Sequence, residues 1–133
     1  MKTEPKIIQL KKIPDERGNL SVIEERKDIP FKIERTYWIY DVPGGAEREG
    51  HAYFENEEFI VCLSGSFEIM VNTGSEEKTF TLNRANKGLF VPKLTWRKLD
   101  NFSTNTVALI IASKTYNEQD YIRSFSEFLN LQK

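Results

Sequence analysis

Residues 50–66 constrain the fold more than any other part of the sequence. Residues 59–63 form an apolar run that favours a buried strand, a turn-forming Ser-Gly-Ser triplet interrupts it, and residues 67–71 resume in alternation. This pattern predicts two strands joined by a tight turn. His51 and Tyr53 lie two residues apart just before them, so an extended chain places both side chains on one face. The only histidine of the protein is therefore predicted to share a face with a phenol.

The rest of the chain repeats this pattern of short apolar or alternating segments between turn-forming residues. In residues 33–42, β-branched and aromatic side chains predict a strand, with Arg35, Tyr37 and Ile39 on one face. Further strands are predicted at residues 7–10, 20–24, 78–82, 89–92, 96–99 and 106–113. Turns are predicted at residues 14–19, 43–46 and 72–77.

Only in the C-terminal tail does the spacing of the apolar residues change from that of a strand to that of a helix. From Asn117 onward the apolar residues recur at helical spacing, with Asn117 as the predicted N-cap and acidic residues in the first turn. These apolar positions are Tyr121, Ile122, Phe125, Phe128 and Leu129. Many short strands followed by one helix predict a single all-β domain over residues 1–133, a jelly-roll barrel or sandwich with one C-terminal α-helix.

Composition and charge argue against several classes of function. Lys and Arg total 19 and Asp and Glu total 20, so a formal net charge of -1 gives no overall attraction to nucleic acid or to an anionic membrane. No apolar stretch approaches the roughly 20 residues that span a bilayer. Cys62 is the only cysteine, so no intrachain disulfide can form, and with no signal peptide apparent the sequence predicts a cytoplasmic protein.

Two motifs resemble the signatures of the cupin family. The first is His51-x-Tyr53 followed by Glu58 and Gly65, with a tyrosine where the family has a second histidine. The second runs from residue 92 to residue 101 and has an arginine, Arg97, in the histidine position. The resemblance implies a cupin jelly-roll barrel.

The same motifs argue against a bound metal. A divalent ion in a cupin is held by neutral imidazoles and a carboxylate, whereas here one imidazole, that of His51, stands with the permanent cation of Arg97. We therefore expect neither a metal nor a cofactor.

Further motifs are spread over nearly the whole chain. They lie at residues 17–20, 29–31, 35–39, 50–52, 63–66, 88–92, 96–97, 101–103 and 120–123. Together they resemble the sugar 3,4-ketoisomerase family of small cupins. The resemblance implies action on dTDP-4-keto-6-deoxyglucose in bacterial routes to the 3-amino sugars of surface polysaccharides such as lipopolysaccharide O-antigen. It also implies a homodimer, often formed by exchange of an N-terminal strand.

Moving a carbonyl from C4 to C3 of a sugar requires removal of the C3 proton, an enediol, and return of a proton at C4. His51 is the predicted base, because its ordinary pKa is near neutrality, and Tyr53 is predicted to contact the sugar oxygens. Tyr37, which matches a tyrosine of the family's strand motif, is predicted to line the pocket. Glu58, in the carboxylate position of the cupin motif, is predicted to bind substrate, to pair with an arginine or to hydrogen-bond across the barrel.

Four arginines are candidates for binding negative charge. Arg17 and Arg97 are predicted to stabilise the enediolate, because fixed positive charge favours a developing oxyanion. Arg48 or Arg35 is predicted to bind the diphosphate through its guanidinium fork.

Two other functions fit the same residues. The chain could be a non-catalytic nucleotide-sugar-binding cupin, because the family's second histidine is replaced by Tyr53, or a related dTDP-sugar epimerase. For the isomerase, Tyr53 and Arg97 favour a gluco-configured product over a galacto-configured one.

Overall fold

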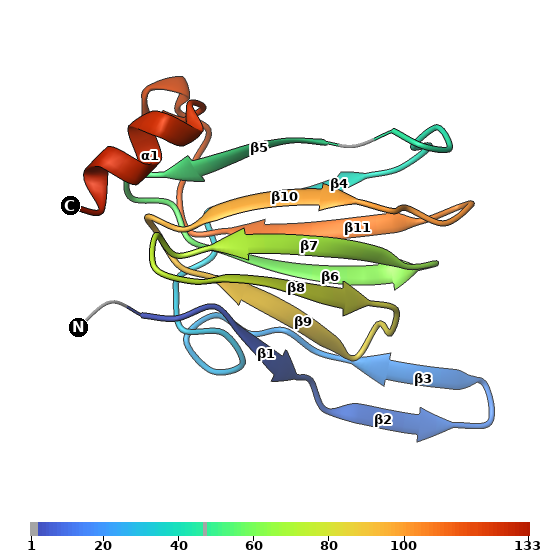
Figure 1. The fold of residues 1–133 in the computed structure, drawn as a ribbon. Helices are drawn as coiled ribbons and strands as arrows, with labels where there is room; N and C mark the ends of the chain where they lie inside the picture. The colour runs from blue at the N-terminus through green and yellow to red at the C-terminus, as the bar shows by residue number, and fades with distance from the viewer. Residues whose placement is uncertain (1–2, 47) are drawn as a thin grey trace.

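The computed structural model describes residues 3–46 and 48–133. Within these residues, two antiparallel five-stranded sheets pack against each other, and a separate two-stranded hairpin extends away from them (Figure 1). The first sheet has the order β1 (Lys6–Gln9), β9 (Lys87–Val91), β6 (Glu58–Ser64), β11 (Val107–Ala112) and β4 (Arg35–Ile39). The second has the order β12 (Tyr121–Ile122), β5 (Arg48–Tyr53), β10 (Trp96–Asp100), β7 (Phe67–Asn72) and β8 (Glu77–Leu82). This arrangement confirms the predicted all-β cupin fold.

The remaining elements lie at the two ends of the chain. The hairpin consists of β2 (Lys12–Asp15) and β3 (Gly18–Ser21). The C-terminal part contains a 3₁₀ turn, η1 (Glu118–Asp120), and the helix α1 (Phe125–Leu131). Among the described residues, no helix is both long enough and apolar enough to cross a membrane.

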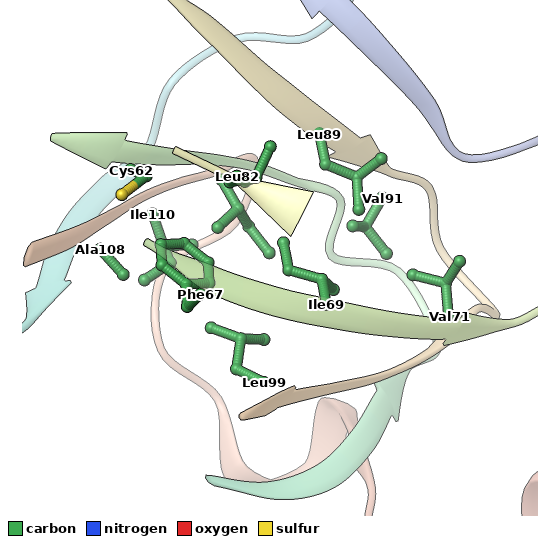
Figure 2. Close-up of a cluster of buried hydrophobic side chains, with 11 residues drawn as sticks. Cys62, Phe67, Ile69, Val71, Leu82, Leu89, Val91, Leu99, Ala108 and Ile110 are labelled. Atoms are coloured by element: carbon green, nitrogen blue, oxygen red, sulfur yellow. The ribbon is translucent and has the colours of Figure 1, made fainter. Parts of the chain in front are cut away.

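The main core lies between the two sheets (Figure 2). Strand β7 directs Phe67, Ile69 and Val71 into it, and Ile60 and Ile110 enter from the facing sheet. A second apolar cluster, which includes Ile29 and Phe31 from the segment before β4, covers the outer face of the first sheet. Strand β6 is therefore buried on both faces from residue 58 to residue 62, which confirms the predicted buried run for residues 59–62. The prediction is wrong for Leu63, which is exposed.

The predicted facing of residues 33–42 is confirmed, although the strand is shorter than predicted. In β4 the side chains of Arg35, Tyr37 and Ile39 are half-buried, while Thr36 and Trp38 are exposed. Asp41 follows with a φ of 56°, in the left-handed region, so the extended strand does not continue through residue 42.

The predicted N-terminal turn is too long. The chain is extended from residue 12 to residue 15 and again from residue 18, so only residues 16 and 17 form the turn. The Asp15 carboxylate accepts a hydrogen bond at 2.9 Å from the backbone N–H of Arg17, and Gly18 follows with a φ of 126°. A short polar side chain and a glycine close the hairpin in two residues.

The predicted start of the C-terminal helix is wrong. Asn117 does act as a cap, since its side chain accepts a hydrogen bond from the backbone of Gln119, but it caps only the short η1 turn. Tyr121 and Ile122 are extended and pair with Tyr53 and Ala52 of β5. The helix α1 begins after Ser124, which is its N-cap. Pairing with β5 satisfies the backbone hydrogen-bonding groups of residues 121 and 122. These residues therefore form a strand at the edge of β5 and not the helix that the spacing of the apolar residues predicts.

Candidate active site

A cavity of about 440 Å³ lies between the two sheets. Its size is typical of a site for a small organic ligand. The strands that end the two sheets on this side, β4 and β12, both contribute side chains to it. The lining side chains are Tyr37, Ile39, Arg48, His51, Tyr53, Glu58, Ile60, Arg97, Leu99, Ile110, Tyr121 and Arg123.

The structure brings together most of the residues that the sequence singles out. Six of them share this one cavity, namely His51, Tyr53, Tyr37, Glu58, Arg97 and Arg48. Arg35 lies beside it, in a smaller cleft of about 230 Å³ that shares Tyr37 and Tyr121 with the main cavity. His51 and Tyr53 occupy alternate positions on β5, as the spacing predicts.

Arg17 is the predicted site residue that lies away from the cavity of its own chain. It lies in the turn of the β2–β3 hairpin, where its side chain is 90% exposed and pairs with Asp15 at 2.9 Å. It does not line the cavity formed by its own chain.

Glu58 is the centre of the polar contacts in the cavity. One carboxylate oxygen, Oε1, accepts a hydrogen bond at 2.7 Å from Nη1 of Arg97. The other, Oε2, accepts hydrogen bonds from the Tyr37 hydroxyl at 2.7 Å and from Nδ2 of Asn56 at 3.2 Å. The Tyr53 hydroxyl lies 3.4 Å from the same oxygen. This confirms the prediction that Glu58 pairs with an arginine.

Arg97 is held rigidly in the wall of the cavity. Its side chain is 1% exposed, and Nη2 donates at 3.3 Å to the backbone oxygen of Thr95. Its Cζ lies 5.0 Å from the centre of the Tyr53 ring. Its Nε is buried and makes no hydrogen bond with the residues that the structure describes, so the guanidinium retains a donor for a ligand oxygen.

The surroundings of Tyr37 and Tyr53 keep both phenols protonated. Burial, followed by the negative charge of Glu58, raises the pKa of the Tyr37 phenol far above its usual range. Burial and Glu58 also raise the pKa of Tyr53, although the nearby Arg97 opposes the shift. Both phenols are therefore hydrogen-bond donors near neutral pH.

His51 lies against an aromatic wall. The centre of its ring is 5.0 Å from that of Tyr53 in an edge-on arrangement, and 5.4 Å from that of Tyr121. On the neighbouring strand β10, Arg97 is its direct partner in the register. The imidazole is half-buried and faces into the cavity rather than bulk water.

The donor set in the cavity does not resemble a metal site. Within residues 3–46 and 48–133, no three His, Cys, Asp or Glu side chains are grouped so that they could hold an ion. The carboxylate of Glu58 is already bound to the guanidinium of Arg97.

Tyr121 and Arg123 are cavity residues to which the sequence analysis gives no role. Helical spacing suggested a different orientation for residue 121, and the strand that carries it has only two paired residues. The one available signal was the alternation of residues 121 and 123 on either side of the apolar Ile122.

The two packed antiparallel sheets and the polar cavity between them define a small cupin. The comparisons with known proteins are more specific. The chain belongs to the family described as WxcM-like, C-terminal (FdtA), whose model matches residues 3–133.

The similar proteins match almost the whole chain. A TDP-4-oxo-6-deoxy-α-D-glucose-3,4-oxoisomerase from Aneurinibacillus thermoaerophilus is 40% identical over 136 residues, which cover 98% of each chain. A 3,4-ketoisomerase structure from Helicobacter canadensis has a TM-score of 0.93 at 42% identity and covers 98% of each chain. A mutant 3,4-ketoisomerase from Thermoanaerobacterium thermosaccharolyticum, solved with TDP-4-keto-6-deoxyglucose, has a TM-score of 0.94 at 34% identity and covers 98% of this chain and 95% of its own.

Proposed function

We propose that this chain is a single-domain nucleotide-sugar 3,4-ketoisomerase. Its substrate is TDP-4-keto-6-deoxyglucose, and its product is the corresponding 3-keto-6-deoxyhexose. The observation that carries the proposal is the position of His51, which faces a cavity also lined by Arg97 and two protonated phenols. The names of relatives that match nearly the full chain support the same activity.

In the proposed reaction His51 is the base that removes the proton from C3 of the sugar. The neutral imidazole removes the proton from C3 and the C4 carbonyl oxygen takes up a proton, which gives the enediol. The C3 hydroxyl then loses its proton as its oxygen becomes the new carbonyl, and a proton returns to C4. Atoms and electrons balance without an external oxidant or reductant. No cofactor is required.

The remaining cavity residues stabilise the negative charge on the enediolate. Arg97 supplies a fixed positive charge and a buried N–H that has no other partner among the described residues. The Tyr53 phenol keeps its proton and can donate it to a sugar oxygen, whereas the Tyr37 hydroxyl already donates to Glu58 and can accept a hydrogen bond from a sugar hydroxyl. Arg48 lines the same cavity and Arg35 the adjoining cleft, and both are cationic groups for the nucleotide.

The test is incubation of the pure protein with the 4-keto sugar in deuterated water, followed by NMR at each ring carbon. An isomerase moves the carbonyl to C3 and incorporates deuterium at C4, and the spectrum also gives the C4 configuration, for which a gluco product is predicted. Absence of exchange supports the non-catalytic binding protein. Exchange at C5, or exchange without carbonyl migration, supports the epimerase.

Two variants assign the roles within that assay. His51→Asn is expected to abolish exchange at C3, because it removes the base. Tyr53→Phe is expected to slow turnover without abolishing exchange, because the phenol donates to oxygen and not to carbon. Normal exchange in His51→Asn contradicts the proposed mechanism.

The proposed function also includes a proposed dimer. The β2–β3 hairpin is exposed along its whole length, including the apolar side chains of Ile13 and Leu20. A two-stranded hairpin is only marginally stable by itself in water. Trp38 of β4 and Tyr40, which follows that strand, are also exposed. We propose a homodimer in which the N-terminal hairpin packs on the second copy and carries Arg17 to the second copy's cavity.

Mixed dimers test this arrangement. Arg17→Ala and His51→Asn proteins are each expected to be impaired. If Arg17 acts across the interface, mixing the two chains restores one complete site, with His51 from one chain and Arg17 of the partner subunit. No recovery on mixing, or a monomeric mass by light scattering, contradicts the proposed dimer.

The proposed location is the cytoplasm. Cys62 is a free and buried thiol in this structure, and cysteines remain reduced in that compartment.

A further inference from the structure

Two phenols approach the same oxygen of Glu58 at different distances. Tyr37 donates to Oε2 at 2.7 Å, the usual length of an O–H···O hydrogen bond, whereas the Tyr53 hydroxyl lies 3.4 Å from that oxygen. A carboxylate has about four lone-pair sites, two on each oxygen. The second site on Oε2 is occupied by Nδ2 of Asn56, which donates at 3.2 Å. Oε2 therefore has its two donors without Tyr53.

The amide of Asn56 is fixed in one orientation behind the cavity wall. Asn56 is buried and does not line the cavity. Its Oδ1 accepts hydrogen bonds from the backbone N–H of Lys114 at 3.0 Å and from the Ser113 hydroxyl at 3.3 Å. Because a backbone N–H can only donate, the carbonyl end of the amide must face Lys114 and the NH₂ end must face Glu58. Asn56 is therefore an obligatory donor to Glu58.

The backbone around Asn56 is held separately from its side chain. The backbone N–H groups of Asn56 and Glu55 donate to the two carboxylate oxygens of Asp120, at 3.0 Å and 2.9 Å. The backbone N–H of Glu57 donates to the Ser113 hydroxyl at 2.8 Å. These bonds attach the connection between β5 and β6 to the segment that follows β11. The side chain of Asn56 can therefore be changed while the backbone anchors remain.

The proton of the Tyr53 hydroxyl is not committed to a single partner. Tyr53 also hydrogen-bonds with the phenol of Tyr121, and in such a pair either hydroxyl can be the donor. A carboxylate is a stronger acceptor than a phenol, because its charge assists the hydrogen bond. Without the amide donor, the second site on Oε2 of Glu58 would take the Tyr53 proton, and a ligand would lose it.

We propose that Asn56 is a positioning residue of the reaction. By occupying the second acceptor site on Oε2 of Glu58, it leaves the proton of Tyr53 for an oxygen of the sugar. The inference rests on the proposed function, in which Tyr53 donates to that oxygen. Asn56 touches neither the substrate nor the reacting atoms and exchanges no proton with them, since it acts only through Glu58.

Asn56→Ala tests the inference by removing the amide donor. Its kcat for carbonyl migration is expected to fall about tenfold or more, because the developing oxyanion loses one hydrogen bond. Binding of TDP, measured by calorimetry, is expected to stay close to that of the wild type, because Asn56 does not line the cavity. Asn101→Gly is the matched control, since Nδ2 of Asn101 also donates to a glutamate, Glu68, and neither residue lines the cavity. Glycine suits this position, where φ is 54°.

A double-mutant cycle separates this role from a merely structural one. Tyr53→Phe is expected to slow the wild-type protein, yet to have little further effect in Asn56→Ala, where the Tyr53 proton is already directed to Glu58. Additive losses in the double variant overturn the inference, and so does a wild-type kcat in Asn56→Ala. A loss of TDP affinity as large as the loss of kcat also overturns it, because it indicates a collapsed cavity.

A second variant covers a failure of Asn56→Ala to fold, which urea denaturation would reveal. Asn56→Ser keeps a polar group in the buried site, but its side chain is shorter and lacks the amide donor. The same fall in kcat and the same cycle with Tyr53→Phe are expected for it.

The outcomes also distinguish this inference from the proposed function. A wild-type protein that isomerises the sugar, with additive effects of the Asn56 and Tyr53 variants, contradicts only the inference. A wild-type protein that neither moves the carbonyl nor exchanges C3 contradicts both.

Discussion

Glu58 shows how one buried carboxylate can organise a site. It accepts hydrogen bonds from an arginine, a tyrosine and an asparagine that come from three different parts of the chain. Each donor would otherwise be a polar group inside a barrel, where an unsatisfied group is costly. Because all of them converge on one side chain, their positions relative to His51 are fixed before substrate binds.

Replacing this carboxylate tests its importance. Glu58→Gln leaves Arg97, which is 1% exposed, without a counter-charge, and breaking one side of a buried pair costs about 3 kcal/mol or more. We expect this loss in the free energy of unfolding, measured by urea denaturation. Glu76→Gln, in the exposed pair with Lys78, is expected to cost less than about 1 kcal/mol. Equal losses in the two variants contradict a structural role for Glu58.

The buried phenols predict a pH dependence of stability. Because the pKa of Tyr37 is higher in the folded state than in the unfolded state, its contribution is fully present below the unfolded pKa and is lost as the pH rises above about 10. We expect the unfolding free energy to fall from about pH 9 to about pH 11, and to fall less steeply in Tyr37→Phe. Tyr40→Phe, at an exposed position, is expected to retain the wild-type slope.

At the scale of elements, the short strand β12 determines which residues complete the cavity. It consists of two paired residues, yet it fixes the orientation of Tyr121 and places Arg123 beside the base. Ile122 anchors it in a small apolar cluster with Ala52, Trp96 and Phe128, which joins β12, β5, β10 and α1. Helical periodicity alone could not predict this, because residues 121 and 122 also fit the apolar face of a helix.

Shortening the side chain of Ile122 tests whether β12 supports the cavity wall. Ile122→Ala is expected to reduce the unfolding free energy by about 2–5 kcal/mol, because the side chain is completely buried. It is also expected to weaken TDP binding, because Tyr121, which belongs to the same short strand and lines the cavity, loses its support. Leu131→Ala, at a position 46% exposed, is the control and should change neither quantity by much. Wild-type TDP affinity in Ile122→Ala would show that β12 does not position a ligand-binding residue.

At the scale of the whole molecule, the barrel places an ion pair where metal-binding cupins have metal ligands. Arg97 takes the position of a histidine in the second cupin motif, and its cation is bound to the carboxylate of the first. The two sheets hold this pair between them, since Glu58 belongs to β6 in one sheet and Arg97 to β10 in the other.

This arrangement predicts that isomerase activity survives removal of metals. Prolonged dialysis against EDTA is expected to leave the rate of deuterium incorporation unchanged, because Glu58 is committed to Arg97. Added Zn²⁺ or Mn²⁺ should not raise the rate. Loss of activity after dialysis, with recovery on adding one of these ions, would contradict the metal-independent mechanism.

The sequence by itself determined most of the strands, the cupin frame and most of the cavity, because alternation with period two fixes which side chains share a face. His51 with Tyr53, and Arg35 with Tyr37, follow from that rule alone. Only the tertiary structure decided that Glu58 gathers its donors across both sheets, that Arg17 lies outside its own chain's cavity, and that residues 121–123 form part of the cavity wall. These facts depend on which strands meet at an edge, and pairing between segments distant in sequence has no local signal.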